Sequence, residues 1–215
     1  MDDQAEHAYT ATRRQLRGVA ESLIAGPQYR GAGTIRLAVR PDGFVGVELP
    51  LAVHGVEFCW QDGAAPLAGR PVDLARAAGV DFGPPHGVYE IVEPLSADTV
   101  LDVDPAAADL LYRSLYAGGY ALKQVLPEQH PVLWPEHFDI AVTEGEVNYG
   151  VSAGDDSHPL PYAYVGPWTP REGPFWHASF GALRTLDVGH DVDELAADIA
   201  AFLTEGMQAA RAGLA

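Results

Sequence analysis

The chain has 215 residues, of which 47% are hydrophobic and 20% are charged, so it can bury a sizeable core and is neither disordered nor fibrous. Asp and Glu number 30 against 13 Lys and Arg, which gives a formal net charge of -17. Because so negative a surface repels phosphate backbones and anionic lipid, we expect neither nucleic acid nor a membrane as a partner.

The cysteine count and the apolar runs bear on the compartment. The single cysteine, Cys59, precludes an internal disulfide. No apolar stretch approaches the ~20 residues of a membrane span or follows the pattern of a signal peptide. These features predict a cytoplasmic protein, folded as a single domain over residues 1–215 with a seam near 79–104.

The first predicted elements are a helix and two β-hairpins. Apolar and small residues recur at helical spacing over 7–24, and Gly26-Pro27 is expected to end this helix. Strands with alternating apolar residues then flank the turn Pro41-Asp42-Gly43 within 35–49. A second alternation over 51–60 predicts another hairpin, so about four short strands begin the sheet.

Two helices are predicted in the middle of the chain. Pro71 suits the first turn of a short helix that Gly79 ends. The segment 79–104 is rich in Gly and Pro and predicts a loop. Asp104-Pro105 then begins a long helix that reaches about Leu126. Its adjacent Gly118 and Gly119 weaken the helix and favour a kink or close packing.

The last part of the chain completes an α+β pattern. A hairpin over 138–151 precedes two predicted strands, at 162–165 and within 177–186. A final helix begins at Asp191 or Asp193 and reaches about Ala210. We therefore expect a mostly antiparallel sheet packed against three main helices. The element order also suggests a duplicated α-β-β-α arrangement, although no repeat is found at the level of residues.

The hairpin over 138–151 predicts a polar face. Pairing Thr143 with Glu146 across the turn places His137 opposite Ser152. On one face the hairpin then carries four polar residues, His137, Asp139, Asn148 and Ser152. An antiparallel sheet often has one solvated face, where such residues cost nothing. The alternative is that the face lines a polar cavity, and both interpretations stay open.

Histidines and tryptophans concentrate around this hairpin. Half of the eight histidines and three of the four tryptophans fall between His130 and His177. In a catalytic interpretation His137 is the acid or base, Asp139 orients it, and His177 joins them from the following loop. The structural alternative is that a histidine beside a tryptophan packs and forms ordinary hydrogen bonds.

A divalent metal is the cofactor that this segment suggests. A His and an Asp two positions apart on a strand point to the same side and can share one ion. The loop over 154–159 adds carboxylates and an imidazole, which suit such a site. The candidate metal ligands are His137, Asp139, Asp155, Asp156 and His158. An ordinary turn capped by Asp and Ser side chains is the alternative for the loop.

Aromatic residues of the same region predict a ligand pocket. The candidate ligand-binding residues are Tyr162, Tyr164, Trp168, Trp176 and Asn148. Aromatic side chains of this kind also form cores and interfaces, which is the alternative. The sequence lacks a nucleophile elbow, a phosphate loop, a dinucleotide fingerprint, a His-Glu-x-x-His motif and paired cysteines. These absences remove the most recognisable hydrolase, kinase, dehydrogenase and zinc-protease mechanisms.

Three short segments stand out as motifs. They are Leu133-Trp134-Pro135-Glu136-His137-Phe138-Asp139-Ile140-Ala141-Val142, Tyr162-Ala163-Tyr164-Val165 and Pro174-Phe175-Trp176-His177. Together they resemble a family of uncharacterised bacterial proteins, a domain of unknown function with a strand of the type Trp-Pro-x-His-Phe-Asp. The resemblance covers about 110–202. It implies this order of helices and strands and this location of the site, without a reaction.

Three functions remain compatible with these patterns. The first is a small-molecule enzyme that uses a His/Asp acid–base pair or a metal within 130–180. The second is a non-catalytic module that binds a small molecule in an aromatic pocket. The third is a structural or partner-binding protein, for which the aromatic segment is core and homo-oligomer interface.

Overall fold

The computed structural model describes residues 2–212, and its internal contacts divide the chain into two compact units. The first unit runs to Tyr112 and also includes 133–138, whereas the second comprises 113–132 and the residues from Asp139 onward. The expected seam, 79–104, lies inside the first unit, so the division falls elsewhere.

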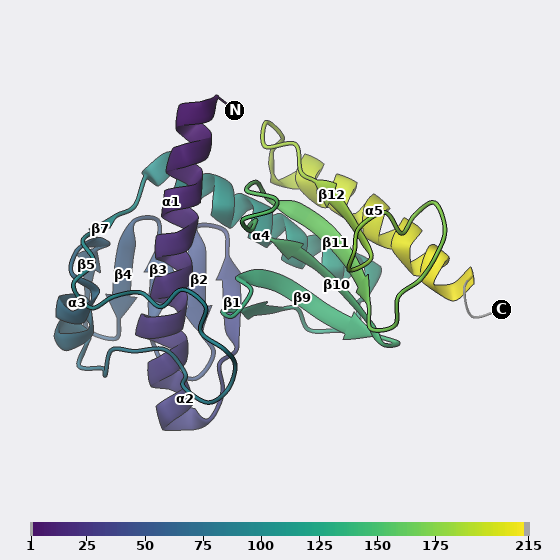
Figure 1. The fold of residues 1–215 in the computed structure, drawn as a ribbon. Helices are drawn as coiled ribbons and strands as arrows, with labels where there is room; N and C mark the ends of the chain where they lie inside the picture. The colour runs from purple at the N-terminus through teal and green to yellow at the C-terminus, as the bar shows by residue number, and fades with distance from the viewer. Residues whose placement is uncertain (1, 213–215) are drawn as a thin grey trace. The chain divides into compact units, whose positions relative to one another are not determined.

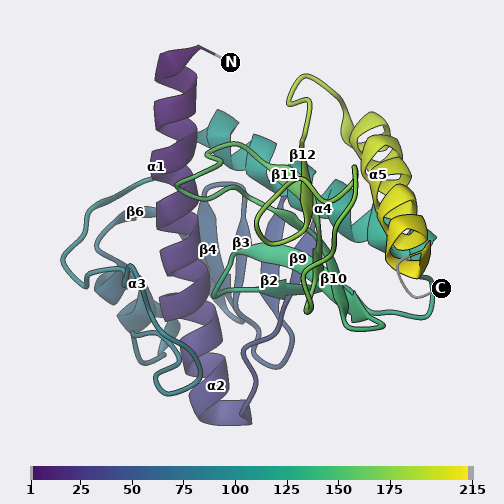
Figure 2. The same cartoon turned by 45° about the vertical axis from the view of Figure 1, so that its right-hand side comes forward.

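The first unit combines a long interrupted helix with short antiparallel strands (Figure 1). Its helices are α1 (Asp3–Val19), the π-helical turn η1 (Ala20–Ala25), α2 (Gly26–Ala32) and α3 (Pro71–Ala78). Its strands are β1 (Leu37–Arg40), β2 (Gly43–Gly46), β3 (Ala52–His54), β4 (Glu57–Trp60), β5 (Gly63–Pro66) and β8 (Val132–Trp134), in the spatial order β8-β1-β2-β3-β4-β5. The strands β6 (Ala68–Gly69) and β7 (Leu101–Asp102) form a separate pair. In Figures 1 and 2 the helix from α1 to α2 runs in front of the strands of this unit.

The first helix continues past the position where the sequence predicted its end. Gly26-Pro27 does not terminate the helix. The chain stays helical through η1 into α2, with Gly26 and Pro27 as the first residues of α2. Gly26 serves close packing: a Cβ there would lie 1.8 Å from the carbonyl oxygen of Gly83. The helix ends at Gly33, whose φ of 74° is left-handed.

The other predicted elements of this half are confirmed. The two hairpins form, with β1 paired to β2 and β3 paired to β4. The helix α3 ends at Gly79, which adopts the left-handed conformation. Asp104 caps the long helix α4 (Pro105–Val125), since its Oδ1 accepts a hydrogen bond from the Ala107 N–H at 2.8 Å.

The second unit is an antiparallel sheet flanked by helices. It contains the part of α4 from Arg113 onward and the C-terminal helix α5 (Val192–Ala212). Its strands are β9 (Asp139–Glu144), β10 (Val147–Ser152), β11 (Tyr162–Pro167) and β12 (Ala182–Thr185), in the order β12-β11-β10-β9. Glycine permits close packing on both helices: a Cβ at Gly118 would lie 2.7 Å from Val151, and one at Gly206 would lie 2.6 Å from Val165.

The α+β prediction is confirmed, with 38% helix, 24% strand and antiparallel pairing throughout. The duplicated arrangement stays a prediction. None of the helices within residues 2–212 combines the length and the apolar character needed to cross a membrane.

The register of the β9–β10 hairpin corrects the predicted one. Thr143 pairs with Asn148, and Asp139 lies opposite Ser152. The turn is Gly145-Glu146, whose φ angles of 57° and 61° are those of a tight hairpin turn. Because the register differs by two residues, the same side chains still share a face. Strand β9 begins only at Asp139, after Phe138 with a φ of 50°, so His137 does not belong to the hairpin.

Candidate functional site

The polar face of the second unit contains a buried group of carboxylates and hydroxyls. Asp139 and Ser152 are each 5% exposed, and Tyr162 is 7% exposed. The Tyr164 hydroxyl donates a hydrogen bond to Asp139 Oδ2. Gly150 makes room for this bond, since a Cβ there would lie 2.7 Å from the Tyr164 ring. The predicted polar face therefore exists, and this end of it is buried.

Asp155 extends this group from the loop after β10. Its Oδ2 accepts a hydrogen bond of 2.6 Å from the Tyr162 hydroxyl. Its Oδ1 accepts bonds of 2.7 and 2.8 Å from the backbone N–H groups of Ser157 and His158. Burial by itself would raise the pKa of Asp155, but these hydrogen bonds outweigh it and hold that pKa below its usual value. Burial and the Asp155 carboxylate together raise the pKa of Tyr162.

The other predicted ligand-binding residues lie apart from this group. Asn148 Oδ1 accepts hydrogen bonds from the Thr143 hydroxyl at 2.7 Å and from Trp168 Nε1 at 3.3 Å. Trp168 is 64% exposed. Trp176 packs edge-on against Phe175 and lines a separate groove of 550 Å³. The five residues predicted for one aromatic pocket are thus distributed over three places.

Neither predicted catalytic histidine lies in the buried group. The His137 side chain is 76% exposed, and its Nε2 lies 3.6 Å from Glu136 Oε1. Both ring nitrogens of His177 are within hydrogen-bond distance of backbone carbonyl oxygens, those of Phe175 at 2.8 Å and Leu183 at 2.9 Å. The His177 ring therefore stabilises its loop and presents no free nitrogen to a substrate.

The predicted metal ligands are not brought together either. Within residues 2–212, no three His, Cys, Asp or Glu side chains gather closely enough to hold a metal ion. In the predicted set, His158 Nδ1 lies 3.9 Å from Asp155 Oδ1, whereas Asp156 is exposed. The predicted ligand set therefore does not form a single site.

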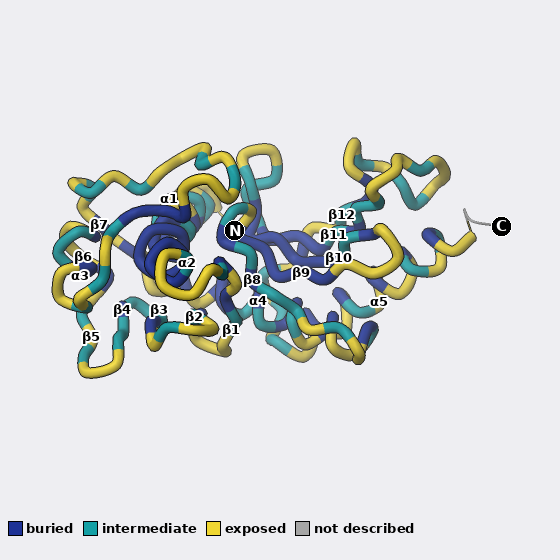
Figure 3. Tube along the Cα trace, turned by 90° about the horizontal axis from the view of Figure 1, so that it is seen from below, coloured by how far each residue is buried: buried dark blue, intermediate teal, exposed yellow. Residues whose placement is uncertain are grey.

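The first unit contains a carboxyl group that the sequence analysis missed. Glu21 lies in the π-helical turn η1 and is 0% exposed, as are its neighbours Ala20 and Ser22. Figure 3 shows the buried coils of this helix in dark blue beside the labels α1 and α2. Short π-helical segments are rare and occur frequently at functional sites.

The surroundings of Glu21 raise its pKa. Burial is the main cause, and it lifts the pKa to about 7. Arg17 Nη2 at 3.7 Å and the Tyr89 hydroxyl, which donates to Oε1 at 3.3 Å, partly offset this effect, whereas the charge of Glu136 adds to it. Glu21 therefore populates both protonation states near neutral pH.

Several polar atoms around this turn lack hydrogen-bond partners among the described residues. They are Glu21 Oε2, Ser22 Oγ and Arg17 Nε, all of them buried. Unsatisfied buried polar groups are uncommon and costly in folded proteins. The turn itself is held by a backbone bond of 3.0 Å, which the Gly83 N–H donates to the Ser22 carbonyl oxygen.

A signal for Glu21 was available in the sequence. Val19 and Ala20 precede it, Leu23 and Ile24 follow it, and all four belong to the buried face of the helix. A carboxylate on an apolar helical face is seldom buried without a reason. Comparison with known proteins adds no assignment: no protein-family model, curated protein or solved structure matches the chain.

Proposed function

We propose that this protein is an enzyme that transfers protons on a small molecule, with Glu21 as the general acid–base group. The observation that carries this proposal is a completely buried carboxyl group, in a π-helical turn, whose pKa lies at about 7. Acid–base catalysis is most efficient when the pKa of the group is close to the working pH. Glu21 meets this condition.

The energetic cost of Glu21 supports a functional role. A buried carboxyl with a raised pKa destabilises the folded chain at neutral pH, where the unfolded chain would ionise freely. Residues that lower stability in this way are typical of active sites.

The hydrogen bonding of the carboxyl group also fits proton transfer. Oε1 accepts a hydrogen bond from the Tyr89 hydroxyl, and this bond orients the carboxyl group. Oε2 is buried and accepts no hydrogen bond from the described residues, so this oxygen would exchange a proton only with a molecule that enters the space around it. Burial raises the pKa of Tyr89 as well, which keeps its hydroxyl protonated and therefore a donor.

The test is a search for turnover with matched variants. The purified protein is incubated with a small-molecule extract of bacterial cells, and mass spectrometry records which compounds are consumed or formed. We expect Glu21→Gln to abolish the changes that the unaltered protein produces. The control is Glu57→Gln, which removes an exposed carboxylate of β4 and should leave them intact.

The same experiment separates the alternatives. If folded Glu21→Gln retains the turnover while Asp139→Asn loses it, the acid–base group belongs to the buried carboxylates of the second unit, within 130–180. If the unaltered protein changes no compound, the enzyme proposal fails. A compound that binds without being altered would then support a small-molecule-binding module.

A further inference from the structure

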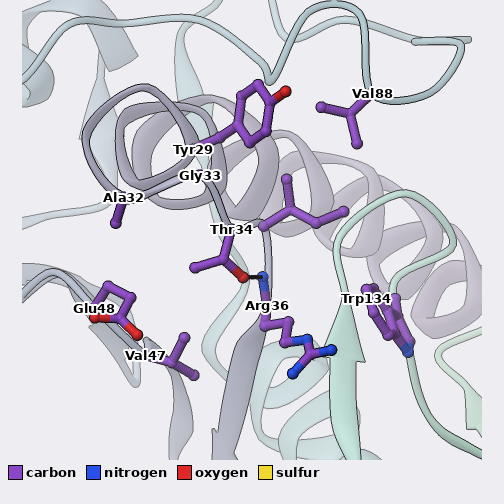
Figure 4. Close-up of a pocket in the computed structure, with 10 residues that line it drawn as sticks. Tyr29, Ala32, Gly33, Thr34, Arg36, Val47, Glu48, Val88 and Trp134 are labelled. Atoms are coloured by element: carbon purple, nitrogen blue, oxygen red, sulfur yellow. Dashed lines mark hydrogen bonds between the residues drawn. The ribbon is translucent and has the colours of Figure 1, made fainter.

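A groove of 610 Å³ lies on the first unit, formed by segments that are distant in the sequence (Figure 4). The end of α2 contributes Tyr29, the residue after β2 contributes Val47, and the loop after α3 contributes Val88. Arg36, the residue before β1, and Trp134 of β8 complete it. Pockets that hold small molecules typically measure ~300–1,000 Å³, so the size suits such a ligand.

Strand pairing brings the two most distinctive side chains of the groove together. Leu37 of β1 pairs with Leu133 of β8, and in an antiparallel pair the preceding residue of one strand lies near the following residue of the other. Arg36 therefore lies beside Trp134, with its guanidinium carbon 6.0 Å from the ring centroid. Figure 4 shows the Arg36 side chain between Val47 and Trp134.

The charge of Arg36 lies beside apolar groups. The chain has 30 acidic and 13 basic residues, and some of its arginines, among them Arg70 and Arg184, form salt bridges. Within residues 2–212 no carboxylate oxygen forms a salt bridge with Arg36, although Glu48 lines the same groove. An exposed guanidinium between apolar walls is suited to a ligand that brings its own negative charge.

A buried amide fixes the groove before any ligand binds. Gln28 of α2 is 0% exposed. Its Nε2 donates to the carbonyl oxygens of Thr34 at 3.1 Å and Arg36 at 2.9 Å, and its Oε1 accepts the Glu48 N–H at 2.8 Å. The backbone on both sides of the groove is thereby held in place, and such preorganisation lowers the entropy lost on binding.

We propose that this groove binds a carboxylate carried on a flat apolar ring system. The Arg36 guanidinium would pair with the carboxylate in bidentate geometry. The Trp134 ring offers a stacking surface, and Val47 and Val88 exclude water from the edges of the ligand. Binding in this groove does not require Glu21 to be catalytic, so it stands or fails independently of the proposed reaction.

The test measures binding of three aromatic carboxylates, naphthoate, benzoate and indole acetate, by isothermal titration calorimetry. At least one should bind, and neutral naphthamide should bind about tenfold more weakly than naphthoate. Arg36→Gln should weaken carboxylate binding by about tenfold or more. Arg40→Gln is the matched control, because Arg40 lies on β1, is exposed and contacts the carbonyl oxygen of Val39.

Three results would overturn the proposal: no carboxylate binds, naphthamide binds as well as naphthoate, or Arg36→Gln and Arg40→Gln have equal effects. Tighter binding of naphthyl phosphate would overturn the choice of a carboxylate as the anionic group. Trp134→Leu serves as a second variant, and it should weaken the binding of naphthoate more than the binding of benzoate. A melting curve of each variant establishes that it is folded before titration.

Discussion

Each unit of the protein contains a carboxyl group that accepts a hydrogen bond from a tyrosine, yet the two pKa values move in opposite directions. In the first unit the pKa of Glu21, bonded by Tyr89, rises to about 7. In the second unit the pKa of Asp155, bonded by Tyr162, falls below its usual value. A tyrosine partner by itself therefore does not decide the protonation state of a carboxyl group.

The two groups differ in burial and in the hydrogen bonds that they accept. The Glu21 side chain is 1% exposed, whereas the Asp155 side chain is 45% exposed and accepts backbone bonds in addition to the Tyr162 bond. Glu21 is inside a continuous helix, where the N–H groups are already bonded to the carbonyls of earlier turns. Asp155 is in a loop, where the N–H groups of Ser157 and His158 are available and donate to it. Hydrogen bonds to the ionised form favour ionisation, whereas burial without them opposes it.

The largest expected effect is on the pH dependence of stability at Glu21. The unfolded chain releases this proton near its usual pKa of 4.5, but the folded chain retains it up to about pH 7. The stabilising contribution is therefore complete below the unfolded value and is lost as the pH rises to about 7. The loss corresponds to roughly 3 kcal/mol. Urea unfolding at about pH 4 and about pH 8 measures it.

Glu21→Gln removes this titration. As the pH rises from about 4 to about 8, the free energy of unfolding of the variant should increase by roughly 3 kcal/mol relative to that of the unaltered protein. Glu57→Gln, at an exposed position, should follow the unaltered protein. If Glu21→Gln and the unaltered protein show the same dependence on pH, Glu21 is not a buried group with a raised pKa, and the comparison of the two units fails.

The second prediction concerns Asp155, where the sign is reversed. Folding lowers the pKa of Asp155. Its contribution to the free energy of unfolding is therefore present above the pKa of the unfolded chain and is lost as the pH falls through the pKa of the folded chain. Asp155→Asn should cost about 1–2 kcal/mol at neutral pH, since it weakens hydrogen bonds to the ionised carboxylate. Denaturant unfolding measures the cost, with exposed Asp62→Asn as the control. An equal cost at about pH 3 would contradict the prediction.

Much of the fold follows from local patterns. Asp104 and Asp191 cap the helices that they were expected to cap, and the alternating strands form the expected hairpins. Errors arose where a contact distant in the sequence decides the structure. The sequence predicts a helix end at Gly26, because the close approach of Gly26 to Gly83 is not visible in the sequence. The predicted register of the β9–β10 hairpin was wrong because two adjacent residue pairs, Glu144-Gly145 and Gly145-Glu146, are both suited to the turn.

The candidate sites were less predictable than the fold. The sequence singles out Asp139 as a partner of His137 or a metal ligand, and Tyr162 and Tyr164 as aromatic residues of a pocket. It does not predict the hydrogen bonds that they form, from Tyr164 to Asp139 and from Tyr162 to Asp155. His137 was wrongly placed on the same strand, because nothing in its sequence indicates the left-handed Phe138 that follows. Glu21 was missed because the helical pattern shows only where polar and apolar residues lie along the helix. Whether a carboxyl group is buried also depends on distant segments, here the loop that carries Tyr89.

The smallest expected effect separates the two tyrosines. Tyr89→Phe removes a hydrogen bond to the carboxyl of Glu21 and should raise its pKa further, while Tyr162→Phe should raise the pKa of Asp155 toward its usual value. The bond at Glu21 is 3.3 Å long and the bond at Asp155 is 2.6 Å, so the second change should be larger. Each pKa change corresponds to a free energy of about 1 kcal/mol or less. Titration of carbon-13-labelled carboxyl groups by NMR measures both. A larger shift at Glu21 than at Asp155 would contradict the expectation that the shorter tyrosine bond has the larger effect on the carboxyl pKa.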